Sequence, residues 1–535
     1  MKKLLGWLDN NILTLISFFL LIFIPLYPKV PLMELIPGYI VRVRLEDFFI
    51  LAAVVVLIIQ VIRKKATLKS IIFWPILIYL GIGLLSCLSA IFITRTVPLE
   101  WLHAGKMFIH WLRRVEYFSL FFIFYNGIKS FKNTKIFLIL CGVLVCLVSI
   151  YGYGQKYLYW PVFSTMNREF SKGVKLYLTE HARVPSTFGG HYDLAAFLVI
   201  FLILFAGLFF FMKDIKIKIA SLLVFLLGYW LLILSASRTS FIAYVFGLIV
   251  MFGISAFKKG WFWSLTRGAI IMIFSFVVMI FFGDLSDRFA HLLKLTEVRE
   301  KWRLERLVSP LKPPPVSDKF VAFDENIPLV VDITDERPVA IRPGQKGDGQ
   351  GLPPDVYEKI PDYRESTESG GLDGTAAAKL ITVERTFSEN AYKYGLSAAI
   401  RLDALWPWAI KAFLKNPLLG SGYSTLGKQG TGQFTEAEST DNDYLRALGE
   451  TGLLGFISFF GIIFIITRSV FKSLKKEKND LLTIFKISFV SFTLGILVNA
   501  IYIDVFEASK LAFIFWAMTG VLLSTLGKKE ALLKK

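Results

Sequence analysis

The chain has 535 residues, of which 55% are hydrophobic and 50 are Phe, and its mean hydropathy is +0.58. This composition excludes an ordinary soluble domain and is typical of a multi-spanning membrane protein. The formal net charge is +19, but the basic residues fall in short clusters between apolar runs, so nucleic acid is not an expected partner. The three cysteines also lie in apolar runs, without the spacing of a disulfide framework or a metal site.

The apolar residues gather in about twelve runs long enough to cross a bilayer. The predicted spans lie near residues 12–27, 47–62, 71–94, 107–128, 135–155, 192–212, 217–235, 239–257, 268–283, 451–470, 482–503 and 508–526. The run near 107–128 contains Arg113, Arg114 and Glu116, so its first half could instead lie in the interface as an amphipathic helix. We therefore predict an all-α fold of about twelve transmembrane helices.

Lys2 and Lys3 precede the first span, and further basic clusters follow every second span, the last of them with Lys528 and Lys529. The positive-inside rule places these clusters, and with them both chain termini, in the cytoplasm. The apolar run after Lys3 is long enough to remain as a first span, so we expect no cleaved signal peptide.

This topology places two long segments outside, at 156–191 and 284–450. We divide the chain into membrane helices 1–9 (1–283), a large extracytoplasmic loop (284–450), and membrane helices 10–12 with a cytoplasmic tail (451–535). Within the loop, about 309–375 is acidic and rich in Pro and Gly, which predicts disorder. The aromatic run 401–413 suits a helix on the outer leaflet.

The large loop ends in the polar stretch Ser439–Gly455, where a helix enters the membrane. Thr440 and Asp441 are good N-cap residues for that helix. Gly449, Gly452 and Gly455 would line one side of it, where a neighbouring segment could approach closely.

Three motifs together resemble the O-antigen ligase and polymerase family of membrane glycosyltransferases. They are Ser235-Ala-Ser-Arg-Thr-Ser240, Asn416-Pro-Leu-Leu-Gly-Ser-Gly422, and Asp441-Asn442 followed by Gly452-Leu-Leu-Gly455; the segment 183–191 is also similar. The resemblance covers about the second two-thirds of the chain. It implies a bacterial inner-membrane enzyme that is active on the extracytoplasmic face. The family's ligases carry a histidine where this chain has Asp441, which favours a polymerase.

The resemblance further implies a glycan donor on undecaprenyl pyrophosphate, which is attacked at its anomeric carbon by an acceptor hydroxyl on a glycan, lipid or protein. Arginines suit the anionic leaving group, so no metal or other cofactor is expected. Arg238 is the candidate for the pyrophosphate and Asp441 for the proton of the acceptor. Arg183, Arg401, Asn442 and His191 are candidate substrate-binding residues.

Each assignment has a structural alternative. Arg238 could contact lipid headgroups, as could Arg183 and Arg401, whereas Asp441 and Asn442 could simply cap a helix. At the level of the whole protein, one alternative is a ligase that transfers finished glycan to a lipid or protein. Another is a polysaccharide or lipid transporter, which would favour charges deep within several spans and paired broken helices.

Overall fold

The computed structural model describes residues 2–34, 42–166, 170–179, 182–282, 362–366, 379–383, 398, 400–426 and 440–533. Its long helices are α1 (Lys2–Leu26), α2 (Leu45–Ile62), α3 (Phe73–Phe92), α4 (Trp101–Gly127), α5 (Phe131–Tyr157), α6 (His191–Phe211), α7 (Ile215–Ser235), α8 (Arg238–Lys259), α9 (Trp261–Phe281), α15 (Asp443–Leu474), α16 (Asp480–Asn499) and α17 (Ser509–Leu533). Shorter helical segments are η1 (Phe170–Lys172), the π-helical turn η4 (Arg401–Leu405) and α14 (Trp406–Lys415). Every predicted span coincides with one long helix, and the all-helical fold class is confirmed.

Eleven helices of the described part are long and apolar enough to cross a membrane. The remaining long helix is α4, the span whose charged residues set it apart in the sequence. In α4 those residues have partners: Arg113 pairs with Asp47 and Glu116 at 3.0 and 2.9 Å. Arg114 is buried. The charges of α4 therefore face protein side chains, whereas those of an amphipathic helix on the membrane surface would face water and lipid headgroups.

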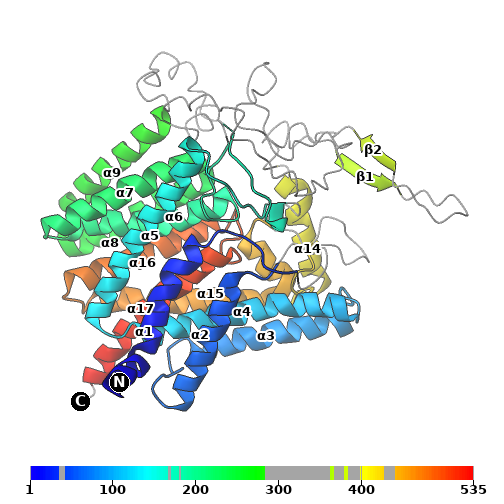
Figure 1. The fold of residues 1–535 in the computed structure, drawn as a ribbon, viewed down its shortest axis with the longest axis horizontal. Helices are drawn as coiled ribbons and strands as arrows, with labels where there is room; N and C mark the ends of the chain where they lie inside the picture. The colour runs from blue at the N-terminus through cyan, green and yellow to red at the C-terminus, as the bar shows by residue number, and fades with distance from the viewer. Residues whose placement is uncertain are drawn as a thin grey trace, which may run out of the picture.

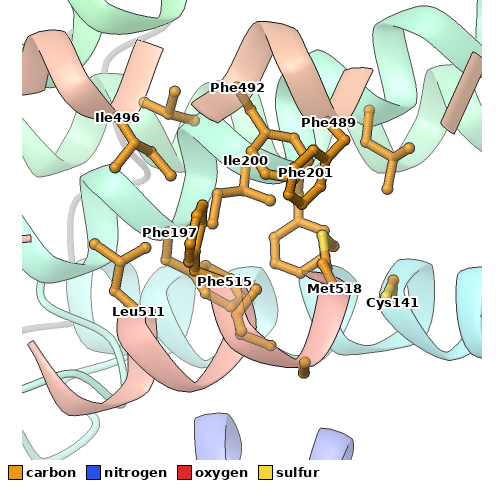
Figure 2. Close-up of a cluster of buried hydrophobic side chains, with 14 of the residues drawn as sticks. Cys141, Phe197, Ile200, Phe201, Phe489, Phe492, Ile496, Leu511, Phe515 and Met518 are labelled. Atoms are coloured by element: carbon orange, nitrogen blue, oxygen red, sulfur yellow. The ribbon is translucent and has the colours of Figure 1, made fainter. Parts of the chain in front are cut away.

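Helix α6 forms the centre of the bundle, and it is buried along nearly its whole length. It packs against α7, α8, α16 and α17. Figure 2 shows Phe197 and Phe201 of α6 among aromatic and aliphatic side chains of α16 and α17. Apolar residues on all sides of α6 permit this position. Because lipid tails are as apolar as these side chains, close packing rather than burial itself is what joins such helices.

Beside the helices lies a small sheet (Figure 1), in which β1 (Asp362–Ser366) pairs antiparallel with β2 (Lys379–Val383). Asp362 stands opposite Val383, and Ser366 opposite Lys379. The disorder predicted for 309–375 falls, apart from β1, outside the described residues. That expectation therefore stays a prediction.

Several loops and helix ends meet at one end of the bundle. Lys510, at the start of α17, donates to the carbonyls of Pro25 and Thr187 at 2.9 and 2.6 Å. Asn499, at the end of α16, donates to the Ser240 hydroxyl at 3.1 Å. The end of α1, the segment before α6 and the start of α8 are thus held around the turn between α16 and α17. The candidate site lies at this end.

Candidate functional site

Helix α15 begins at Asp443, and its N-cap is Asn442, whose side-chain oxygen accepts the Leu445 N–H at 2.9 Å. The Asn442 amide also donates to the Ile501 carbonyl at 2.9 Å. The expectation that Thr440 or Asp441 caps this helix is wrong. Thr440 and Asp441 precede the cap because the chain must turn before the helix starts.

Asp441 occupies the left-handed region, with φ of 51°. Its carboxylate forms an ion pair with Arg401, 2.8 Å away. The Arg401 guanidinium also lies 3.9 Å from the centre of the Tyr502 ring. The Arg401 side chain is 4% exposed, whereas that of Asp441 is 31% exposed. The pair therefore has a buried cation and a carboxylate that solvent or substrate can still reach.

Arg401 is placed by η4 and α14. The wider π-helical turn precedes α14, which has Pro near its first position, where a missing N–H costs little. Ala409 of α14 is buried close to Gly449 of α15, whereas Ile410 and Leu414 are exposed. Helix α14 thus fixes Arg401 against the start of α15 and leaves an apolar edge free for the predicted contact with the outer leaflet.

The motif Asn416–Gly422 lies directly against a break in α15. The break is at Gly452, whose φ is 66° and ψ is −168°. Leu453 and Leu454 donate their N–H groups to the carbonyls of Pro417 and Leu418 at 2.8 and 3.2 Å. In return, the Gly449 and Glu450 carbonyls accept from Ser421 and Gly422, both at 2.9 Å. The backbone groups freed by the break are therefore satisfied by the motif.

Glycine is required on both sides of this contact. A Cβ on Gly452 would lie 2.4 Å from the backbone of Leu418, and one on Gly420 would lie 2.5 Å from that of Glu450. The predicted close approach to the glycines of α15 is confirmed for Gly449 and Gly452. A Cβ on Gly455 would instead meet Thr451 of the same helix. Two motifs far apart in the sequence thus form one structural unit.

A small cavity of about 30 Å³, lined by both charged and aromatic side chains, adjoins the break and has room for one or two water molecules. Arg446 and Arg114 line it, and both pair with Glu450, at 3.3 and 3.6 Å. Tyr423 also lines the cavity; burial raises the pKa of its phenol well above the ordinary value, so the group stays neutral. The cavity is too small for a sugar, and Asp441 is not among the residues that line it.

Arg183 and His191 contact each other: the arginine Nη1 lies 2.5 Å from the His191 Nε2 and 3.1 Å from the Tyr192 hydroxyl. The histidine is the first residue of α6. The same first turn carries Asp193, which lies close enough to Asp441 for their like charges to repel. The first outer segment is therefore close to the Asp441 site.

Arg238 is the first residue of α8 and is half-buried. Ser237 caps the helix by accepting the Ser240 N–H at 3.4 Å. Ser240 in turn contacts Asn499, and Asp443 donates its N–H to the neighbouring Ala500 carbonyl at 2.9 Å. Among the described residues, the Arg238 guanidinium has no hydrogen bond or ion pair, so it is a cation free to bind an anion.

The candidate residues therefore gather at one end of the bundle. Asp441 pairs with Arg401 and Arg183 contacts His191, whereas Arg238 pairs with none of these residues. Asn442 caps a helix. Over the described ranges, no cluster of His, Cys, Asp and Glu side chains could hold a metal ion.

Sequence reasoning did not assign Arg446, Glu450 or Asp504 to the site. Glu450 and Asp504 are buried, and the Arg446 side chain is 11% exposed. A signal was present, because Arg446 and Glu450 stand four residues apart at the start of an apolar helix, where ionisable side chains generally have a function or a partner.

Comparison with known proteins agrees with this arrangement. Residues 369–460 match a family model described as O-Antigen ligase. The matched region contains Arg401, Asp441, Asn442 and both halves of the Gly420–Gly452 contact, whereas Arg183, His191 and Arg238 lie before it. No curated protein sequence matches the chain. The match covers residues 369–460, the part of the chain that builds the site, and it supports membership of the O-antigen ligase and polymerase family.

Proposed function

We propose that this protein is a glycosyltransferase that polymerises undecaprenyl-pyrophosphate-linked oligosaccharide units at the outer face of the bacterial inner membrane. The family is a class of glycosyltransferase-like membrane enzymes. The observation that carries the proposal is the partly exposed Asp441 carboxylate, paired with Arg401 at the bundle end that also holds the half-buried Arg238.

The reaction needs a base, a nucleophile and a leaving group. The acceptor hydroxyl oxygen forms a bond to the anomeric carbon of the donor, and the bond from that carbon to the pyrophosphate oxygen breaks. The pyrophosphate leaves with the bonding electrons, and the hydroxyl proton passes to Asp441. The Arg401 ion pair orients the carboxylate for this transfer.

Arg238 suits the leaving group, because a guanidinium fork matches phosphate oxygens and a half-buried position strengthens their attraction. Arg183 is a second cation at the same end, placed to contact the donor sugar or its phosphates. Arginines can neutralise the pyrophosphate, so we expect activity to persist when divalent cations are chelated.

The test compares Arg238→Ala and Asp441→Ala with Arg95→Ala, which removes an exposed arginine from the turn after α3. Polymer formation by purified protein from lipid-linked oligosaccharide is measured in detergent, where no sealed membrane permits transport. We expect each site variant to lose about 100-fold or more in rate, as is typical when one electrostatic contact to the transition state is removed. Arg95→Ala should remain near wild type. Normal polymer from both site variants would show that the site is wrongly assigned.

A ligase is the second candidate, because the matching family model is described as O-Antigen ligase. The chemistry at the anomeric carbon is the same, and the acceptor differs. Supplying a lipid or protein acceptor together with lipid-linked glycan separates the two. A polymerase lengthens the lipid-linked glycan, whereas a ligase moves it to the second acceptor.

A further inference from the structure

Asp504 lies in the turn between α16 and α17 and is buried. Its two carboxylate oxygens accept backbone N–H groups from Thr440 at 3.1 Å and from Asn442 at 2.7 Å. These peptide groups stand on either side of Asp441. A single carboxylate therefore holds the backbone at the point where Asp441 adopts its left-handed conformation.

Asp504 is itself held by Arg446. The Arg446 Nη1 lies 2.8 Å from the carboxylate of Asp504, and the same guanidinium reaches Glu450 at 3.3 Å and Glu507 at 3.8 Å. Arg446 is one turn into α15, after the Asn442 cap. A buried carboxylate needs a cation and hydrogen bonds to remain charged, and here Arg446 and the two N–H groups supply them.

We propose that Asp504, held by Arg446, is a positioning residue that fixes the backbone of residues 440–442 and thereby sets the place of the Asp441 carboxylate during glycosyl transfer. The inference rests on the proposed function for its effect on rate, but not for its effect on the backbone. Asp504 acts through Asp441 and need not touch the substrate. A small displacement of a proton acceptor slows its reaction strongly while leaving remote substrate contacts intact.

The test variant is Asp504→Asn, which keeps the size of the side chain but replaces one accepting oxygen by an amide nitrogen and removes the charge that pairs with Arg446. In the purified full-length protein, amide hydrogen exchange over residues 440–446 should become roughly tenfold faster, because a buried N–H loses its partner. The kcat for polymer formation should fall by roughly tenfold. The KM for lipid-linked donor should stay within about twofold, because uniform substrate binding is not altered.

The matched control is Glu477→Gln, which breaks a buried ion pair with Lys486, 2.8 Å long, at the opposite end of α16. It should leave both the exchange of residues 440–446 and kcat unchanged. If Asp504→Asn proves unfolded, Arg446→Lys is the second variant, since a single ammonium cannot span the three carboxylates that the guanidinium reaches. It should change exchange and kcat in the same direction.

Wild-type exchange over 440–446 in the folded variant, or a fall in kcat no greater than that of Glu477→Gln, would overturn the proposal. A fall in kcat accompanied by an equal rise in donor KM would also overturn it, because Asp504 would then act on binding. If exchange responds as expected but wild-type protein makes no polymer, the proposed function fails while the role of Asp504 in holding residues 440–442 stands.

Discussion

At the scale of single residues, Asp441 combines a left-handed backbone with a buried arginine partner. Non-glycine residues adopt this conformation infrequently, and Asp tolerates it better than most. The strain places the carboxylate beside Arg401 rather than in the cap position that its residue type favours. A carboxylate kept out of a helix cap remains available for proton transfer.

The coupling between Arg401 and Asp441 can be measured with Arg401→Gln, Asp441→Asn and the double variant. Each single change leaves the other group without its charge partner, so the double variant should be destabilised by less than the sum of the two. We expect a coupling of about 1 kcal/mol, because one partner is buried and the other partly exposed. Thermal unfolding in detergent measures it, and strictly additive shifts would show that the two groups do not interact.

At the scale of elements, α15 is the helix that organises the site. Its break at Gly452 lets the Asn416–Gly422 motif replace helical hydrogen bonds, and this contact holds the motif against α15. The helical segment before the break is short, and it holds Asn442, Arg446 and Glu450 at fixed positions. A continuous helix would have no backbone groups to offer the motif.

Gly452→Ala should therefore disrupt the protein. The new Cβ would lie 2.4 Å from the Leu418 backbone, at a φ of 66° that disfavours alanine. A loss of about 3 kcal/mol or more is expected from combined overpacking and backbone strain. The readout is the melting temperature and the yield of monodisperse protein in detergent.

Gly461→Ala is the control within the same helix, because no atom lies within 4 Å of its added Cβ. Because alanine has a higher helix propensity than glycine, this substitution should be neutral or should stabilise the protein by up to about 1 kcal/mol. Equal behaviour of the two variants would contradict the close contact at the break.

At the scale of the whole molecule, the helices place the basic clusters at one end and the site at the other. Arg63, after α2, pairs with Asp9 near the start of α1 at 2.5 Å. Lys258, at the end of α8, donates to the Glu477 carbonyl at 3.5 Å. These contacts join helix ends that the positive-inside rule assigns to the cytoplasm.

Labelling can test this orientation with single cysteines at exposed positions, Glu100→Cys near the site end and Lys476→Cys near the basic end. A membrane-impermeant maleimide should label position 100 in spheroplasts, and position 476 only after permeabilisation. The native cysteines should give little background, because Cys87 and Cys141 are buried and Cys146 is half-buried. The reverse pattern would invert the topology and place the site in the cytoplasm.

The sequence by itself determined the helices. Spanning length, apolar composition and the spacing of charges are local properties, so every predicted span overlaps one long helix. Some helices extend further than predicted: α1 starts at Lys2 rather than near residue 12, and α15 at Asp443 rather than near 451. The motifs also marked segments that meet in the fold: Asp441 pairs with Arg401, and the glycines of 416–422 contact those of 449–452.

Only the tertiary structure decided which residues face one another. That Asp441 pairs with Arg401, and that Asp504 and Arg446 hold the backbone beside it, depends on contacts between residues that lie roughly 40 to 60 positions apart in the sequence. Side-chain type and spacing fix a helix, because its hydrogen bonds join neighbours along the chain. Ion pairs and backbone contacts between helices follow from how the helices pack, and no local pattern carries that information.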